Sequence, residues 1–404
     1  MGNEMFFGEE RNYRALYGKL FAALLNKFGA DYISEIEDAI HNSLLKSLKI
    51  RSQDTILNNM ENWLFIVARN DLLNQIKKDK EKNSFSAQHM EGYAAESCQT
   101  DLRLQTVLFI SAVENISSQA KILFALKDIF GLSISEISSC TLMGKEAVYK
   151  SIARTKKNIR YQFKGKTVEL DSIAAVREEI AMAEEIFYAV FNIGYDCFDE
   201  KAQGVFNEDL CLDAMALTKL LYGRYKYGST GSLLALFCFH AARSAARVVN
   251  GRLISFFSQD REKWNTELIA LGFHYLKKPK TLNRFYLEAV IISRYMSIAE
   301  LTQNDWLDIV KLHEIMQQVC LSPIARLNYC FCLAKIGKTQ QALQILSQIE
   351  KELPAEHIYF SLVKAKILKE TRPEESDDLF TSVLSKMNQK IRKEYLLENE
   401  SVGL

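Results

Sequence analysis

The sequence is poor in the two residues that most often form turns. It has 17 glycines and 4 prolines among 404 residues, and all four prolines lie in the last third of the chain. Sandwiches and barrels need a turn between successive strands, so this scarcity argues against them. Hydrophobic residues make up 48% of the chain, which is enough to bury large cores and excludes global disorder. We therefore predict an all-α fold with several domains.

The chain also lacks an excess of charge, a long apolar run and paired cysteines. Lys and Arg number 51 against 50 Asp and Glu, which excludes a wholly basic nucleic-acid binder. No run of about 18 uncharged apolar residues occurs, and the first residues do not follow the pattern of a secretory signal. The eight cysteines are dispersed without a CxxC pair, which is typical of reduced and mostly buried thiols. We expect a cytoplasmic protein.

Sequence signals of catalysis are missing as well. There is no glycine-rich phosphate loop, no cluster of metal ligands and no convincing nucleophile with a neighbouring base. The six histidines are dispersed. We therefore expect neither an enzyme nor a cofactor.

Hydrophobic periodicity divides the chain into four parts. Residues 1–84 contain three stretches with apolar residues at helical spacing, and residues 85–101 are polar, which predicts a linker. Residues 102–166 form a compact helical domain, and residues 167–404 a longer helical array. The segment 101–166 holds 11 basic and 5 acidic residues, a net charge of +6 that the balanced total conceals.

Two of the expected helices in the first domain have an assignable apolar face. Between Ile33 and Leu48 that face consists of Ile33, Ile36, Ile40, Leu44, Leu45 and Leu48. Between Glu61 and Lys82 its members are Trp63, Leu64, Ile66, Val67, Leu73 and Ile76. The other side of the latter helix is polar and basic, with side chains suited to phosphates and unstacked bases: Arg69, Asn70, Asn74, Lys77, Lys78 and Lys80. A solvated helix face is the alternative.

The segment Gly131–Arg160 has the pattern of a helix-turn-helix. Ser133 and Glu136 can form a capping box at the start of a short helix, and Gly144 can take a positive φ in the turn that follows. A second helix is expected from about Lys145, with Val148, Ile152 and Ile159 facing inward. Its early turns would reach base edges through Lys145, Glu146, Tyr149 and Lys150. Phosphate contacts would come from Arg154, Lys156, Lys157 and Arg160.

The C-terminal array contains spacings typical of tetratricopeptide repeats. Gly337, Ala342, Leu346, Ile349 and Pro354 suit the turn, second helix and exit of one unit, and plain helical hairpins are the alternative. The concave surface of such an array suits a peptide, a protein or a small ligand. Asp260, Arg261 and Trp264 could line a site there. The other interpretation is an ion pair between Asp260 and Arg261, with Trp264 in the core.

Taken together, these segments resemble bacterial RNA polymerase sigma factors of the extracytoplasmic-function group. The resemblance is carried by Glu37-Asp38-Ala39, Trp63-Leu64, Ala68-Arg69-Asn70 and the helix-turn-helix that ends with Arg154–Arg160. The remainder resembles a subgroup with a long tetratricopeptide-like extension. Its matching residues are Phe191–Tyr195, Leu234–Ala242, Asp260-Arg261 with Trp264, Tyr286–Ala289, Asp305-Trp306, and Ser322-Pro323 with Leu327-Asn328.

The resemblance implies a factor that binds core RNA polymerase and promoter DNA, both duplex and melted. Glu37, Asp38, His41 and Asn42 would dock on the polymerase. The basic face from Arg69 to Lys80 would read the minus-ten element and capture an unpaired base, and the helix from Lys145 would read the minus-thirty-five element. His41, Asn42, Asn74, Lys77 and Lys78 depart from the residues usual in that group, and so does the Lys150-Ser151 pair, where it often has Ser-Arg.

The long extension would regulate the two DNA-binding domains. We expect that deletion of the residues after about 168 changes promoter activity and leaves both domains folded. A helix-turn-helix regulator that binds duplex operator DNA without joining polymerase is the alternative to the sigma-factor interpretation.

Overall fold

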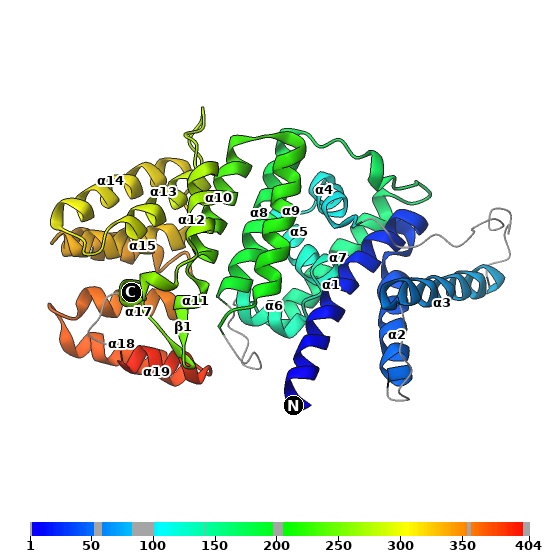
Figure 1. The fold of residues 1–404 in the computed structure, drawn as a ribbon, viewed down its shortest axis with the longest axis horizontal. Helices are drawn as coiled ribbons and strands as arrows, with labels where there is room; N and C mark the ends of the chain where they lie inside the picture. The colour runs from blue at the N-terminus through cyan, green and yellow to red at the C-terminus, as the bar shows by residue number, and fades with distance from the viewer. Residues whose placement is uncertain are drawn as a thin grey trace. The chain divides into compact units, whose positions relative to one another are not determined.

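The computed structural model describes residues 2–51, 59–82, 101–141, 143–196, 205–353 and 357–398, with backbone only for 2–13, 50–51 and 79–82. The described chain is almost entirely α-helical (Figure 1), which confirms the predicted all-α class. Within these ranges the strands are β1 (Val248–Val249) and β2 (Arg252–Leu253), which form a short antiparallel hairpin. The chain divides into two compact units, residues 1–199 with 207–220, and residues 200–206 with 221–404.

The first unit begins with three helices, α1 (Gly2–Phe28), α2 (Ile33–Arg51) and α3 (Met60–Lys82), with the turn η1 (Ala30–Tyr32) before α2. α2 packs against α1 and α3. The buried face of α3 consists of Leu64, Phe65, Ala68, Leu72 and Ile76. The predicted face was partly wrong, because Ile66 is exposed while Phe65 is buried.

The apolar stripe predicted for α2 is also shorter than expected. Ile33, Ile36 and Ile40 are buried, whereas Leu45 is 58% and Leu48 is 50% exposed. The C-terminal half of this helix is packed on one side, where Ser43 and Ser47 are fully buried, but Leu45 and Leu48 lie on its other side. The exposed leucines therefore extend the solvent-facing surface of α2.

Five short elements follow and form the expected compact helical segment. They are α4 (Arg103–Ala112), α5 (Ser118–Phe124), the π-helical turn η2 (Ala125–Ile129), α6 (Ile134–Thr141) and α7 (Lys145–Gln162). α7 packs against α5 and α6. Of the predicted linker 85–101, the described residues include only Asp101, so its expected character lies outside the described chain.

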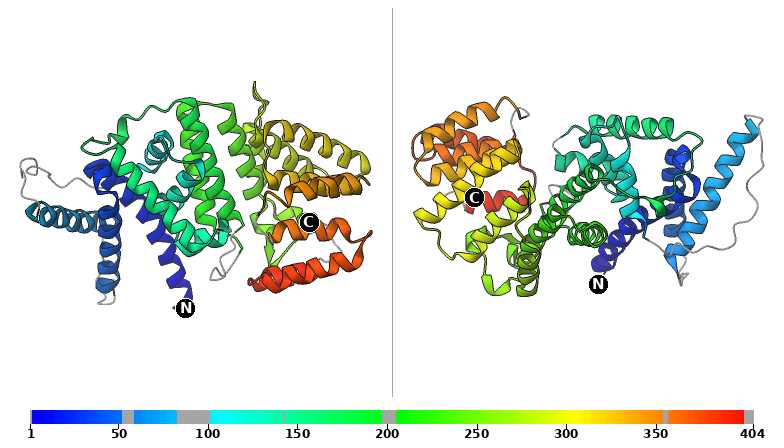
Figure 2. Two further views of the ribbon diagram at one scale, coloured as in Figure 1. Left: turned by 180° about the vertical axis from the view of Figure 1, so that it is seen from behind. Right: turned by 90° about the horizontal axis from the view of Figure 1, so that it is seen from above.

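Two helices from beyond residue 168 complete the first unit. After the turn η3 (Leu170–Ser172), α8 (Arg177–Tyr195) packs against α4 and α5, and α9 (Glu208–Tyr225) runs beside α8 in the ribbon views (Figure 2). Gly194 of α8 lies so close to α9 that a Cβ atom there would be 2.9 Å from Leu210 and 3.0 Å from Cys211. α8 and α9 therefore lie against the part of the compact helical segment that contains α4 and α5.

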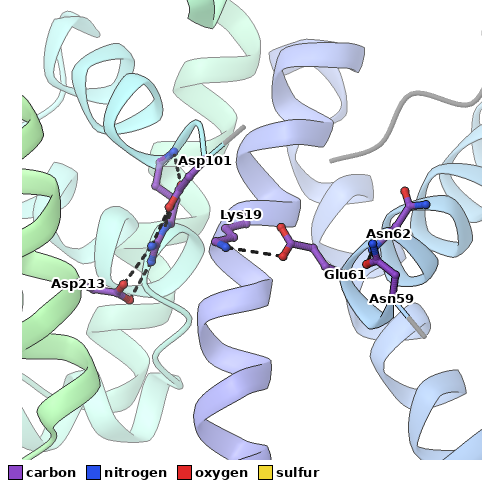
Figure 3. A network of polar contacts seen from close by, with 7 residues as sticks. Lys19, Asn59, Glu61, Asn62, Asp101 and Asp213 are labelled. Atoms are coloured by element: carbon purple, nitrogen blue, oxygen red, sulfur yellow. Dashed lines mark hydrogen bonds and ion pairs between the residues drawn. The ribbon is translucent and has the colours of Figure 1, made fainter. Parts of the chain in front are cut away.

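A buried guanidinium group fixes this association. Arg103 of α4 donates to both carboxylate oxygens of Asp213 on α9, at 2.8 and 3.0 Å, and also to Asp101 at 2.8 Å. Figure 3 shows Asp101 and Asp213 pointing toward the same space. Burial alone would lower the pKa of Arg103, but the hydrogen bonds to the two carboxylates raise it. The guanidinium group of Arg103 therefore keeps its positive charge in the buried space between α4 and α9.

This arrangement differs from the expected domain boundary after residue 166. A chain cut at about 168 would lose α8, α9 and the Asp213 partner of Arg103. Such a cut would expose the faces of α4 and α5 that α8 covers. The deletion that was expected to leave the helix-turn-helix domain folded would thus remove these contacts.

The second unit is a succession of helical hairpins. Its helices are α10 (Gly228–Ala241), α11 (Ser244–Arg247), α12 (Thr266–Tyr275), α13 (Arg284–Ser297), α14 (Gln303–Val319), α15 (Pro323–Lys335), α16 (Thr339–Ile349), α17 (Ile358–Leu368), α18 (Pro373–Lys386) and α19 (Lys390–Glu398). The turns η4 (Phe256–Ser258) and η5 (Arg261–Lys263) connect β2 to α12. From α13 to α18, each helix packs against the next one in the chain.

The spacing noted around Gly337 corresponds to one of these hairpins. Gly337 has φ of 79° at the end of α15, a conformation that glycine adopts without strain. Ala342, Leu346 and Ile349 of α16 are buried in the core with α15 and α17. Pro354 lies outside the described residues.

Asp260 and Arg261 do not pair with each other, so that interpretation was wrong. Asp260 caps η5 by accepting from the backbone of Glu262. Arg261 donates to the carbonyl oxygens of Met296 and Ile298 at the end of α13. Trp264 is buried, as the alternative to a ligand site predicted, and the Arg261 guanidinium lies 4.9 Å from its ring centre.

Two further expectations concern the whole chain. In the parts that the structure describes, no helix is long and apolar enough to cross a membrane. Among the described cysteines, Cys211, Cys238, Cys330 and Cys332 are buried, and none of those described forms a disulfide. This agrees with the predicted buried thiols.

We predict that Asp213→Asn destabilises the first unit. The substitution keeps the size of the side chain but removes the negative charge that holds the buried Arg103, which should lower the free energy of unfolding by about 1–3 kcal/mol. Urea unfolding followed by circular dichroism measures the loss. Glu208→Gln, an exposed change in the same helix, is the control and should have little effect; equal losses would contradict the proposed importance of the Arg103 contact.

Candidate nucleic-acid interface

The helix-turn-helix begins with the predicted capping box. The Ser133 hydroxyl accepts from the backbone N–H of Glu136 at 3.2 Å, and the Glu136 carboxylate accepts from the backbone N–H of Ser133 at 2.7 Å. The second helix starts at Lys145, as predicted. Gly144 was expected to take a positive φ, but its φ is −61°, and it acts as the extended residue that precedes α7. The left-handed glycine is Gly131, with φ of 68°, at the entry to α6.

α7 has two clearly different faces. Val148, Ile152 and Ile159 are buried, as predicted. The other face is exposed and carries Lys145, Glu146, Tyr149, Lys150, Arg154, Lys157 and Arg160. Tyr149 is 63% exposed despite its size. This face could present cationic and aromatic groups to a nucleic acid.

Two candidates for base contacts on α7 are paired with each other. The Lys150 ammonium lies 2.6 Å from the Glu146 carboxylate one turn earlier. Both side chains are largely exposed, so this ion pair contributes little to stability. The pair can therefore break, and the Lys150 ammonium or the Glu146 carboxylate can then bind another group.

Lys156 lies on the buried side of α7, whereas a contact with a DNA phosphate requires an exposed side chain. It is 7% exposed, and its ammonium binds Asp128 at 2.8 Å and also contacts Glu37. In this conformation Lys156 is occupied by two carboxylates and cannot reach DNA. The predicted role fits Arg154 and Lys157, which are exposed, and does not fit Lys156.

The exposed face of α3 holds most of the second candidate set. Asn70, Asn74, Lys77 and Lys78 are exposed, opposite the buried side of that helix. Arg69 is half-buried and donates to the Asn70 side chain at 3.1 Å. The side chain of Lys80 lies outside the described residues. Lys19 of α1 pairs with Glu61 at the start of α3 at 3.6 Å (Figure 3), which helps to orient the helix.

The third candidate set, on α2, is split between two environments. Asp38, His41 and Asn42 are exposed, and Asn42 donates to Asp71 of α3 at 2.8 Å. Glu37 instead turns toward η2 and α7, where it pairs with Lys127 at 2.8 Å and with Lys156. The His41 ring lies 5.5 Å from the ring of Tyr17.

Pairing with groups of opposite charge explains how Glu37 and Lys156 remain charged although they are partly or fully buried. Burial alone would raise the pKa of Glu37, but the ammonium groups of Lys156 and Lys127 outweigh it and lower that pKa to about 2. Burial raises the pKa of Asp128, which Lys156 only partly offsets. The pKa of Lys156 rises because its two carboxylates outweigh the effect of burial. His41 is exposed, but the part of its ring that packs near Tyr17 is desolvated, which lowers its pKa, and Lys127 adds to the effect.

Comparison with known proteins adds a partial family match. Residues 180–280 match the model of a family of unknown function, DUF6596. The chain is also 23% identical over 354 residues to an uncharacterized protein of Rhizobium meliloti (strain 1021), covering 83% of this chain and 81% of that protein. No solved structure matches the chain. The matched segment begins inside α8 and ends before α13.

Sequence reasoning missed Lys127 and Asp128 as structurally important residues. Both lie in the π-helical turn η2, whose widened backbone departs from the period used to assign faces. An indirect signal was present, because Lys127 and Asp128 are two adjacent charged residues inside the otherwise apolar segment Phe124–Phe130. A charge in such a setting needs a partner of opposite sign.

Potential ligand sites outside these helices are modest. The described residues contain no group of three or more side chains that could hold a metal ion. In the second unit a cavity of about 430 Å³ is lined by residues of α16, α17 and α18. Lys364 in its wall pairs with Glu375 at 3.5 Å and Glu350 at 3.8 Å, and Arg372 also pairs with Glu375 at 3.2 Å, so the two positive and two negative charges balance.

We predict that the stabilising effect of Glu37 disappears in acid. Because its pKa in the folded chain lies below the ordinary 4.5, the stabilisation is complete above about pH 4.5 and is lost as the pH falls toward 2. Glu37→Gln mimics the protonated group. The difference in unfolding free energy between the natural chain and this variant, measured with urea, should therefore be largest near neutral pH and shrink in acid. A difference that stays constant with pH would contradict the assignment.

Proposed function

We propose that this chain is a sigma factor of the extracytoplasmic-function group, which binds core RNA polymerase and directs promoter recognition, melting and the start of transcription. The observation that carries the proposal is the two-faced α7 behind a capped α6. One face is apolar and buried, and the other holds Lys145, Tyr149, Lys150, Arg154 and Lys157 in solvent. That is the arrangement a recognition helix needs to enter the major groove of the minus-thirty-five element.

The exposed face of α3 supports a role at the minus-ten element. Asn70, Asn74 and Lys77 lie three or four residues apart, so they follow one side of the helix. Amide groups can hydrogen-bond to base edges, and the ammonium group of Lys77 can bind a phosphate. An unpaired base that gains such contacts regains part of the free energy lost on unstacking.

Promoter specificity would come from joining the two DNA contacts through polymerase. Cationic side chains supply salt-dependent affinity, and base contacts add discrimination of about 1–3 kcal/mol for each good bidentate pair. The proposal gives α2 the polymerase contact, through Asp38, His41 and Asn42 on its exposed side and through Glu37. A sigma factor performs no covalent chemistry, so an enzyme activity is not part of the proposal.

We also propose that the C-terminal extension regulates these contacts. In support, α8 and α9 share one compact unit with the helix-turn-helix helices, and the Arg103–Asp213 contact ties α9 to α4.

Reconstituted transcription tests the proposal. Core RNA polymerase, the full chain and genomic DNA should give specific transcript starts that neither protein gives alone. A chain that binds duplex DNA by itself, fails to co-purify with core polymerase and does not alter transcript starts would be a helix-turn-helix regulator instead.

A matched pair of lysine variants tests the assigned DNA face. Lys157→Gln should weaken promoter binding by the holoenzyme and reduce the slope of log affinity against log salt by about 1, because one phosphate contact is lost. Lys351→Gln removes an exposed lysine from the second unit and should leave the slope unchanged. Fluorescence anisotropy of labelled promoter DNA over a series of salt concentrations measures both. Equal slopes for the two variants would argue against α7 as the contact.

A further inference from the structure

The first unit packs together two groups of helices that the sequence assigns to separate domains. α1 lies against η2, and α2 lies against α7. Arg14 of α1 pairs with Glu136 of α6 at 2.7 Å, and Glu35 of α2 pairs with Arg160 of α7 at 3.2 Å. The helix-turn-helix is therefore held directly against the helices that precede the predicted linker.

The contact is tight at the level of the backbone. A Cβ atom at Gly18 of α1 would lie 1.9 Å from the carbonyl oxygen of Ile129, which is impossible without movement of a main chain. At Gly131, a Cβ atom would lie 2.9 Å from Cγ of Arg14. Two glycines on opposite sides of the same contact allow this close approach.

A buried set of charges closes the same contact. The Glu37 carboxylate of α2 accepts from Lys127 of η2 and from Lys156 of α7, and Asp128 is the second partner of Lys156. Asp128 is fully buried, and Lys156 nearly so. Because a buried charge that loses its partner is costly, these pairs resist separation of the two groups of helices more than surface ion pairs would.

The covered surface overlaps the one assigned to polymerase. Glu37, His41, Leu45 and Leu48 follow one stripe of α2, since their spacings are three or four residues. The helix-turn-helix group engages Glu37 at one end of this stripe, and Lys127 also influences the charge of His41. The other end carries the exposed leucines. A partner that docks along the whole stripe would have to displace Lys127 and Lys156 from Glu37.

We propose that the Glu37 ion pairs form an internal latch, which holds the helix-turn-helix group over part of the polymerase-docking stripe of α2, so that the chain opens before it binds core polymerase. The inference rests on the proposed function. The closed form leaves the outer face of α7 exposed, so the latch restrains polymerase docking and not the DNA-facing side chains. Apparent affinity for polymerase is then reduced by the fraction of chains that are open.

Two variants loosen the latch without touching a residue assigned to polymerase or DNA. Lys127→Gln removes one partner of Glu37, and Arg14→Gln breaks the separate pair with Glu136. Each should bind core polymerase about tenfold more tightly than the natural chain, if the closed form dominates. Lys164→Gln, an exposed change just after α7, is the matched control and should bind like the natural chain. Biolayer interferometry with immobilised core polymerase measures the affinities.

A zero-length cross-link reports the closed form without polymerase. A carbodiimide activates the Glu37 carboxylate, and the neighbouring Lys127 amine attacks it to form an amide while the reagent leaves as its urea. Peptide mass spectrometry should detect this link in the natural full-length chain. Its yield should fall in Arg14→Gln, which keeps both linked residues, and should fall again when core polymerase is bound first.

The outcomes separate the latch from the proposed function. Tighter binding by both loosened variants, with a lower cross-link yield in Arg14→Gln, supports the latch. Equal binding by the natural chain and the variants overturns the latch and leaves the sigma-factor proposal standing. Absence of binding by all of them overturns both. If a variant fails to fold, the cross-link yield of the natural chain still tests the latch. A Glu37–Lys127 cross-link yield that does not fall when core polymerase is bound would contradict the proposal that the chain opens before binding.

Discussion

The buried ammonium group of Lys156 sets the geometry of the first unit. A charge in such a position needs carboxylate partners, and they come from two other elements, Glu37 of α2 and Asp128 of η2. Successive residues of an α-helix point about 100° apart. Turning Lys156 inward therefore turns Lys157 and Arg154 outward, so the buried ion pair acts together with Val148, Ile152 and Ile159 to set which face of α7 meets solvent.

The same principle operates where the C-terminal extension joins the first unit. Arg103 is buried with carboxylates from either side, one immediately before α4 and one on α9. Both networks connect segments that are distant in sequence, and both use charge where an apolar contact would be less selective about orientation. Buried ion pairs thus join the helix groups of the first unit in addition to apolar contacts such as that of Phe21 of α1 with Phe124 of α5.

Much of the local structure could be predicted because it depends on neighbouring residues. The capping box of Ser133 and Glu136, the start of α7 at Lys145 and its buried Val148, Ile152 and Ile159 all follow from short-range patterns. The all-α class follows from the scarcity of turn residues. The hairpin of α15 and α16 follows similarly from the spacing around Gly337.

The errors arose where a distant segment decides the outcome. Periodicity puts Lys156 on the same face as the buried Ile152 and Ile159, but it does not reveal the carboxylates that let an ammonium group lie there, because those partners are in other elements. It also could not tell that Leu45 and Leu48 are exposed, since that depends on which segments pack against α2. On α3, Phe65 and Ile66 are adjacent apolar residues, and only the packed neighbours determine which one is buried. The pairing of Arg261 with the end of α13 is likewise invisible in the local sequence.

The glycine at position 18 has a mechanical consequence. At Gly18 no side chain separates α1 from the main chain of Ile129 in η2. The contact between these two elements therefore has no side chain at this point that could change its rotamer and fill the gap if they moved apart. Packed surfaces of this kind switch between discrete arrangements and do not deform gradually. A small separation of α1 from η2 would lose the van der Waals contact at Gly18. The two elements should therefore separate in one cooperative step.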